Sequence, residues 1–230
     1  MKRRFTTVVA CALALGAAPA AHAASTTCPP AGTDHLGYSA QLGSNTVSVI
    51  DLDAQRSIDQ ITGFNYPFNA EVSPDGRRLY VDNSPIGQND KDYFQILDLC
   101  SRQPVKTIQT GGPAFSSITN DGRYVYNVPP GGPIRRFDTG DDRETSIPTD
   151  DPDVFYAVST DGKVVWLEDA NLADTNHAGY AYAIDGETGN VISPKVQIGF
   201  EPVVAQMTPD GSKLVTFNLG SSVSIVDTKT

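Results

Sequence analysis

A short turn built on Asp-Gly recurs four times along this chain. Its copies are Pro74-Asp75-Gly76, Asn120-Asp121-Gly122, Thr160-Asp161-Gly162 and Pro209-Asp210-Gly211, with aspartates 46, 40 and 49 residues apart. In such a turn the carboxylate accepts hydrogen bonds from the neighbouring backbone, and glycine takes the positive φ that closes a hairpin. A hairpin signal that returns every ~40–50 residues is typical of the blades of a β-propeller.

Short runs rich in Val, Ile and aromatic residues flank each turn and divide into four strands per unit, A to D. Strand A precedes the Asp-Gly turn, strand B follows it, strand C ends in an aspartate, and strand D leads to the next unit. The strand C aspartates are Asp51, Asp98, Asp138, Asp185 and Asp227. Because each lies in a different unit, we expect them to cap the turn between strands C and D rather than to act together in catalysis. No stretch keeps a 3.6-residue period, so the predicted fold is all-β.

Two segments resemble a known repeat. Residues 44–51 and 72–83 look like the YVTN-type propeller repeat, a WD40-like repeat named after a strand B tetrapeptide, of which Tyr80-Val81-Asp82-Asn83 is the nearest copy. The resemblance runs from about His35 to Thr230. It implies an exported, typically seven-bladed propeller similar to quinoprotein amine dehydrogenase and lactonase-type propellers. The repeat itself brings no catalytic motif.

The predicted strands do not fill a whole number of blades. The chain enters at strand B (residues 36–41), completes three units, and ends after strands A, B and C of another, which gives 18 strands or about 4.5 blades. A closed propeller usually pairs its first and last strands in one shared blade. We therefore predict four-stranded antiparallel blades in an incomplete seven-bladed ring, truncated at the C-terminus. A closed ring of four or five blades with irregular ends is the alternative, and an open ring would favour self-association through exposed strand edges.

The first residues read as an export signal. Lys2, Arg3 and Arg4 precede an apolar stretch over residues 5–18, and Ala21-His22-Ala23 supplies a small-x-small cleavage pattern. We predict a Sec-type signal peptide over residues 1–23, an N-terminal tail over 24–35 and the propeller repeats over 36–230. The protein is then secreted or periplasmic and is not inserted in a membrane.

The charge balance argues against a nucleic-acid partner. Residues 1–23 contain three basic and no acidic residues, so 14 of the 17 basic residues remain against 27 acidic ones, a net charge of about −13. Such a field repels phosphate backbones. We expect a protein or a small molecule as the partner.

Cys28 and Cys100 are the two cysteines that follow the predicted signal peptide. An even number of cysteines in an oxidising compartment favours one disulfide, here between Cys28 and Cys100. Two free thiols or an intermolecular pair are the alternatives. No CxxC motif or Cys/His cluster is present, so the sequence indicates neither a structural zinc nor a redox site.

Loop length separates the two ends of the predicted propeller. The A–B turns are tight, whereas the B–C and D–A loops at the opposite end vary in length, and function tends to reside in variable loops on a rigid scaffold. The candidate ligand-binding residues at that end are Tyr66, Asn69, Glu168, Asp169, Asp174, His177 and Glu201. Their spacing matches no regular calcium loop, and no G-x-S-x-G nucleophile motif occurs. We assign no catalytic residue, no metal ligand and no evident cofactor, and we expect Trp166 and Phe217 to pack between blades.

The leading functional hypothesis is a binding or interaction scaffold that uses the loop-rich end. The alternative is an enzyme of the lactonase or quinoprotein-dehydrogenase type, which would need several polar side chains to converge in the central channel. Strand A lines that channel, and its few polar residues, Asn69, Glu71 and Gln206, are scattered along the sequence. This scatter favours the binding hypothesis.

Overall fold

The computed structural model describes residues 35–84, 91–129, 131–149, 154–169 and 178–229. The predicted signal peptide, Cys28, Asp174 and His177 lie outside these residues. The described part contains eighteen β-strands and no α-helix. In this part no helix is long and apolar enough to cross a membrane.

The strands form five antiparallel sheets that follow one another in chain order. The first sheet contains β1 (Leu36–Gln41), β2 (Thr46–Asp51) and β3 (Arg56–Ile61). The second contains β4 (Pro67–Val72), β5 (Arg78–Asn83), β6 (Tyr93–Asp98) and β7 (Gln103–Gln109). The third contains β8 (Phe115–Ile118), β9 (Tyr124–Val128), β10 (Ile134–Asp138) and β11 (Glu144–Ile147). The fourth contains β12 (Val154–Ser159), β13 (Val164–Asp169), β14 (Ala178–Asp185) and β15 (Val196–Phe200). The fifth contains β16 (Pro202–Met207), β17 (Lys213–Asn218) and β18 (Ser222–Asp227).

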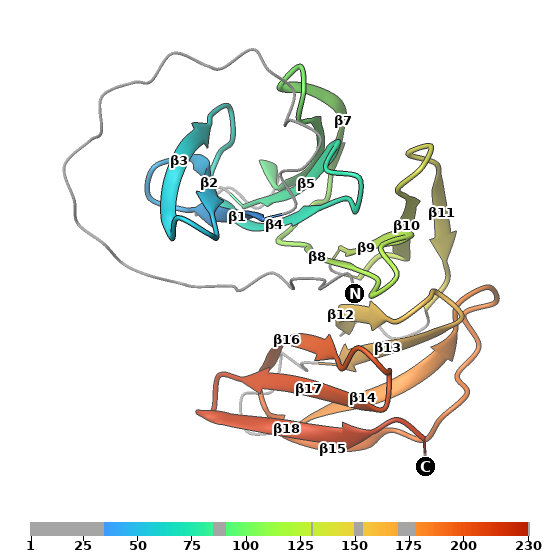
Figure 1. Cartoon of the computed structure of the whole chain (residues 1–230). Helices are drawn as coiled ribbons and strands as arrows, with labels where there is room; N and C mark the ends of the chain where they lie inside the picture. The colour runs from blue at the N-terminus through green and yellow to red at the C-terminus, as the bar shows by residue number, and fades with distance from the viewer. Residues whose placement is uncertain (1–34, 85–90, 130, 150–153, 170–177, 230) are drawn as a thin grey trace.

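This arrangement confirms the expected strand count. The first sheet consists of strands B, C and D, the three middle sheets are complete, and the last sheet consists of strands A, B and C. Figure 1 shows the first and last sheets at the two ends of the row. In the described residues β1 pairs with β2 alone and β18 with β17 alone, so no shared sheet closes the ring.

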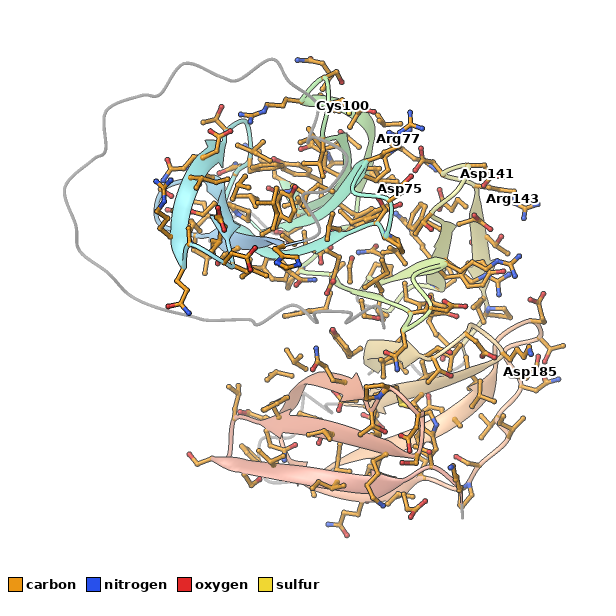
Figure 2. The ribbon with its side chains drawn as sticks, viewed as in Figure 1. Asp75, Arg77, Cys100, Asp141, Arg143 and Asp185 are labelled. Carbon is orange, nitrogen blue, oxygen red and sulfur yellow. The ribbon has the colours of Figure 1, made fainter. Side chains whose placement is uncertain are left out.

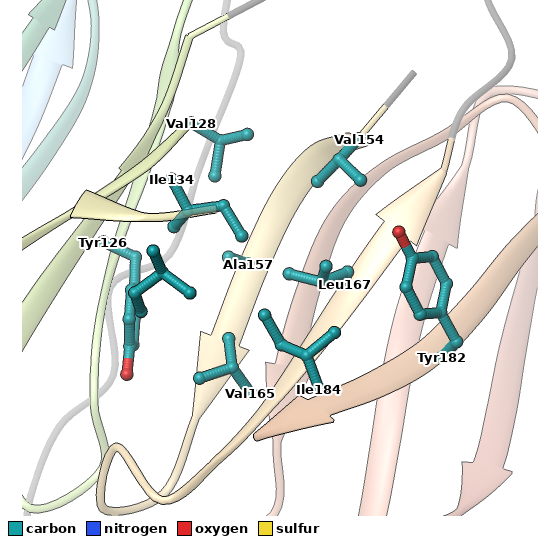
Figure 3. Packing of buried hydrophobic residues seen from close by; sticks show 10 residues of the cluster. Tyr126, Val128, Ile134, Val154, Ala157, Val165, Leu167, Tyr182 and Ile184 are labelled. Atoms are coloured by element: carbon teal, nitrogen blue, oxygen red, sulfur yellow. The ribbon is translucent and has the colours of Figure 1, made fainter. Parts of the chain in front are cut away.

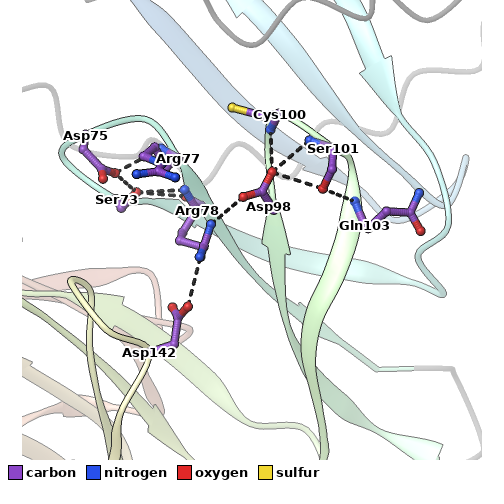
Figure 4. Close-up of polar contacts among 9 residues, drawn as sticks. All are labelled: Ser73, Asp75, Arg77, Arg78, Asp98, Cys100, Ser101, Gln103 and Asp142. Carbon is purple, nitrogen blue, oxygen red and sulfur yellow. Dashed lines mark hydrogen bonds and ion pairs between the residues drawn. The ribbon is translucent and has the colours of Figure 1, made fainter.

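The repeated aspartates have the structural roles that the sequence indicates. In the Asp-Gly turns, Asp75 Oδ1 accepts a hydrogen bond from the Arg77 N–H at 3.0 Å, and Gly76 has a φ of 68°. At the end of β6, Asp98 Oδ1 accepts from the Cys100 N–H at 3.0 Å and the Ser101 N–H at 2.8 Å (Figure 4). The other four strand C aspartates, Asp51, Asp138, Asp185 and Asp227, cap their turns in the same way.

The A–B and C–D turns lie at one end of the propeller. Figure 2 shows Asp75 and Arg77 of an A–B turn on the same side of the molecule as Asp141 and Arg143 of a C–D turn. The B–C and D–A connections leave from the opposite ends of the strands. The variable loops are therefore gathered together, as the sequence predicts.

The hydrophobic core lies between neighbouring sheets. We call the face of each sheet that is turned toward the next sheet in the chain its front face, and the other its back face. Between the third and fourth sheets, Tyr126 and Ile134 on a front face belong to one buried cluster with Val165, Leu167 and Ile184 (Figure 3). Because alternate residues of a strand point to opposite faces, each sheet contributes to two such clusters.

Trp166 packs between blades as predicted, but Phe217 does not. Trp166 lies on the front face of the fourth sheet in a cluster that includes Leu214 and Val226 of the fifth. Phe217 lies on the front face of the fifth sheet and is 46% exposed. The prediction for Phe217 was wrong because no described sheet follows the fifth to cover that face.

Candidate functional site

The predicted site residues fall into two groups. Tyr66 and Glu201 precede the innermost strands β4 and β16, with positive φ values of 52° and 50°. The Tyr66 N–H donates to Asn45 Oδ1 at 2.8 Å, and the Glu201 carbonyl accepts from the Leu219 N–H at 2.9 Å. These two residues shape the D–A connections.

Asn69, Glu168 and Asp169 form the second group, at the loop-rich ends of the strands. Asn69 lies on β4, and Glu168 and Asp169 are the last residues of β13. All three are buried. Asp174 and His177, which complete the predicted polar cluster, lie outside the described residues.

Asp82 joins Asn69 in a polar network that the sequence-based prediction of the site omits. One carboxylate oxygen of Asp82 accepts from the Ser116 hydroxyl at 2.8 Å and from Asn127 Nδ2 at 3.1 Å. The other accepts from the Ser116 N–H at 2.8 Å and from Asn69 Nδ2 at 3.2 Å. The network therefore fastens the second sheet to the third. A sequence signal was available, because Asp82 takes the place of Thr in the YVTN tetrapeptide.

The Asp82 carboxyl is almost fully buried, and burial raises its pKa to about 7. Its four hydrogen bonds oppose that shift, because each one stabilises the ionised form. Asp82 is thus a buried acid whose four hydrogen bonds offset only part of the cost of burying its charge.

Glu168 occupies the same repeat position as Asp82. Each lies six residues after the glycine of its turn, Gly76 for Asp82 and Gly162 for Glu168. Glu168 is 0% exposed, yet neither of its carboxylate oxygens accepts a hydrogen bond from the described residues. Burial raises its pKa to about 8. Buried polar groups in native structures are nearly always partnered, so this carboxyl calls for an explanation.

Sequence differences between blades account for the missing partners. The donor Ser116 stands six residues before Gly122, and the residue six before Gly211 in the following blade is Ala205, whose side chain has no donor. The donor Asn69 pairs with Asp82 across its blade, whereas Tyr156 is the residue that pairs with Glu168. Two of the three side chains that donate to Asp82 are therefore replaced around Glu168, and Thr216, which takes the place of Asn127, donates to Asn218 Oδ1 at 3.4 Å instead.

Tyr156 lies among three acidic side chains. Burial raises the pKa of its hydroxyl well above the ordinary value, and the nearby carboxylates of Glu71, Glu168 and Asp82 add to the shift. The Tyr156 hydroxyl donates to the Ser116 carbonyl at a long distance of 3.5 Å. Acidic side chains of the second and fourth sheets therefore lie close enough to Tyr156 to affect its hydroxyl.

Asp169 differs from Glu168 although the two are adjacent. Its carboxylate is 3.0 Å from Lys195 Nζ, which also lies 4.9 Å from the centre of the Tyr182 ring. Successive residues of a strand point to opposite faces, so Asp169 and Glu168 do not form a carboxylate pair. In the described part of the chain, no three His, Cys, Asp or Glu side chains gather where they could hold a metal ion.

Only one of the two cysteines of the predicted disulfide lies within the described residues. Cys100 is disulfide-bonded. Cys28 lies outside the described residues, so its pairing with Cys100 stays a prediction.

Comparison with known proteins reveals a structural likeness. No family model matches the chain, and no curated protein matches it. Hydrazine synthase from Kuenenia stuttgartiensis superposes with a TM-score of 0.65 at 23% identity, over 82% of this chain and 58% of that one. The chain thus spans little more than half the length of this neighbour. At that identity the likeness concerns the fold alone, and it supports the β-propeller architecture.

Proposed function

We propose that this protein is an exported β-propeller that acts as a binding scaffold and takes its ligand at the end formed by the B–C and D–A loops. The observation that carries the proposal is the Glu168 carboxyl, which is buried at that end without a hydrogen-bond partner in the described residues. An unpaired buried carboxyl destabilises a fold, and a bound ligand that donates hydrogen bonds or carries positive charge removes that cost.

A small organic ammonium ion is the ligand class that this chemistry favours. The net charge, −10 for the full sequence and about −13 without residues 1–23, attracts cations to the protein. Near neutral pH the Glu168 carboxyl, with its pKa of about 8, is largely protonated. An ammonium group stabilises the ionised carboxylate, so binding at pH 7 releases a proton from Glu168.

Butylammonium is a suitable probe, with butyrate as the control of opposite charge. We expect butylammonium to raise the melting temperature of the wild-type protein in a concentration-dependent way, and butyrate to have no such effect. Calorimetric titrations at pH 7 in phosphate and in Tris should reveal the released proton as a buffer-dependent heat. Glu168→Gln should abolish both responses.

Asp169→Asn is the matched control, because it neutralises the neighbouring carboxylate, which is already paired with Lys195. It should retain the butylammonium response. An equal response in the Glu168→Gln variant would show that the amine acts elsewhere and would remove the basis of the proposal.

Two further measurements test the rest of the proposal. Mass spectrometry of the protein recovered from the periplasm or the medium should find an N-terminus at Ala24. Elemental analysis of the same sample should find no stoichiometric metal. One bound metal per chain would favour the lactonase-type enzyme over a pure binding scaffold.

A further inference from the structure

Three aromatic side chains form a row along the innermost strands of the second, third and fourth sheets. Phe68 lies on β4, Phe115 on β8 and Tyr156 on β12 (Figure 1). Each is among the first three residues of its strand, where the D–A loop enters, so the row lies at the loop-rich end. The ring centres of Phe68 and Phe115 are 4.8 Å apart, and those of Phe115 and Tyr156 are 6.5 Å apart. We call Phe68, Phe115 and Tyr156 the aromatic row.

The aromatic row ends beside Glu168. Tyr156 is directly opposite Glu168 on β12, and Ala181 is directly opposite it on β14. Opposite residues in an antiparallel pair point to the same face. Tyr156 and Ala181 belong to one buried apolar cluster, and Phe115 packs against that cluster. The Glu168 carboxyl, which has no hydrogen-bond partner in the described part of the chain, is therefore flanked by apolar side chains.

The surroundings of the aromatic row favour a positive charge. Phe68 and Phe115 are partly exposed, so part of each ring is open to contact. The face of an aromatic ring attracts a cation that lies within about 6 Å of its centre. The carboxyl groups of Glu71 and Glu168 lie near the Tyr156 hydroxyl. A cation bound at Glu168 can therefore contact a carboxylate and aromatic rings at the same time.

The apolar cluster beside Glu168 limits the number of N–H donors that a ligand can satisfy there. The Tyr156 hydroxyl is the one side-chain oxygen of that cluster. A primary ammonium carries three N–H donors, and a donor left against apolar groups is costly. A quaternary ammonium has none, so it leaves the Glu168 carboxylate without a donor. A tertiary ammonium has one N–H for Glu168, and its N-methyl groups carry positive charge to the ring faces.

We propose that the ligand carries a dimethylammonium group, whose N–H donates to Glu168 and whose methyl groups contact the aromatic row. This inference rests on the proposed function, because it names the kind of ammonium ion that the same site prefers. Glu168 supplies the acceptor and the charge. Phe115 and Phe68 determine the preference for a methylated over an unmethylated nitrogen.

Calorimetric titration of the purified exported chain at pH 7 tests the preference with three probes that share one butyl chain. They are N,N-dimethylbutylammonium, butylammonium and butyltrimethylammonium. We expect the dimethyl compound to bind at least about fivefold more tightly than butylammonium, because contact between a cation and an aromatic ring is strengthened when water is excluded. It should also bind more tightly than the trimethyl compound, which has no N–H. Glu168→Gln should abolish binding of the dimethyl compound.

Phe115→Leu tests the part of the aromatic row, because leucine keeps an apolar side chain without a ring face. The dissociation constant of butylammonium divided by that of the dimethyl compound should fall at least about threefold. A purely structural role of Phe115 would weaken both ligands equally and leave this ratio unchanged. Phe200→Leu is the matched control, because Phe200 is a partly exposed phenylalanine of the outer strand β15 and lies outside the aromatic row. It should keep the wild-type ratio.

The outcomes separate this inference from the proposed function. If circular dichroism shows that Phe115→Leu impairs folding, Phe68→Leu takes its place, and an unchanged ratio overturns the inference. Butylammonium or butyltrimethylammonium binding as tightly as the dimethyl compound also overturns it, while the proposed function stands. If none of the three ammonium ions binds, the proposed function is wrong, and this inference is wrong with it.

Discussion

Asp82 and Glu168 occupy the same position in two blades, and only Asp82 is hydrogen-bonded. Four donors from two sheets surround the Asp82 carboxylate, whereas the Glu168 carboxyl has no donor in the described residues. At this repeat position, Asp82 holds two sheets together through its hydrogen bonds. Glu168 has two acceptor oxygens that no donor of the described residues uses. Under the proposed function, this contrast separates a structural from a ligand-binding use of the same position in the fold.

Replacement of Asp82 should destabilise the protein strongly. Asp82→Ala leaves the buried donors of Asn69, Ser116 and Asn127 without their acceptor, and each unsatisfied group costs about 1–3 kcal/mol. We expect a loss of ~3 kcal/mol or more in the free energy of unfolding, measured with urea. Asp82→Asn keeps one acceptor oxygen and should lose less. An Asp82→Ala variant as stable as the wild type would mean that the network contributes nothing.

Glu168→Gln should stabilise the protein, and more so at high pH. Burial raises the folded-state pKa of Glu168 to about 8, above its ordinary value of 4.5, so the folded state holds the proton more tightly than the unfolded chain. Stability from this group is therefore present below pH 4.5 and is lost as pH rises to about 8. The contribution of Glu168 to the free energy of unfolding changes by at most about 1.4 kcal/mol per pH unit.

Urea unfolding at pH 5, 7 and 9 gives the free energy of unfolding of the wild type and of Glu168→Gln as a function of pH. The stability gap between Glu168→Gln and the wild type should widen with pH, while Asp82 titrates alike in both proteins. The Asp169→Asn variant should show no such widening. Parallel curves for wild type and Glu168→Gln would mean that Glu168 is ionised in the folded protein at neutral pH.

Most of the fold could be predicted from the sequence because its determinants are local. The turn at Asp75-Gly76 and the cap at Asp98 depend on hydrogen bonds to residues two or three positions away. Such local chemistry can be read from one segment at a time, and it locates the blades and sorts their loops. That the ring lacks further blades stays a prediction.

The candidate site was less accessible to sequence reasoning because it depends on contacts between blades. Asp82 meets Ser116 and Asn127, which are 34 and 45 residues away. Whether Glu168 is partnered depends on the residues of two other strands, which its own segment does not reveal. The exposure of Phe217 was missed for the same reason, since it depends on whether a sheet covers the last blade.

Gly122→Ala should cost more stability than Gly76→Ala, although both glycines close equivalent turns. Their φ values are 74° and 68°, so alanine is strained at either position by about 1 kcal/mol. A Cβ on Gly122 would lie 2.0 Å from Pro74 Cγ of the preceding blade, whereas nothing lies within 4 Å of a Cβ on Gly76. We expect a further loss of about 1–3 kcal/mol for Gly122→Ala. Equal losses in urea unfolding would indicate that the two turns do not pack closely.

Arg78 should be worth more to stability than its neighbour Arg77, because it links two blades. Arg78 Nη1 lies 2.6 Å from Asp98 Oδ2 in its own sheet, and Arg78 Nε lies 3.0 Å from Asp142 Oδ2 in the next sheet (Figure 4). All three side chains are about one-fifth exposed, so solvent screens these ion pairs only in part. Arg78→Ala leaves two carboxylates without their cation and should reduce the free energy of unfolding by ~1–3 kcal/mol. Arg77→Ala removes the same charge from an exposed position one residue away and should change stability by less than about 0.5 kcal/mol. Urea denaturation of both variants at low and high salt measures these losses. If the two variants lose the same free energy of unfolding, and both losses disappear at high salt, Arg78 contributes only through its net charge.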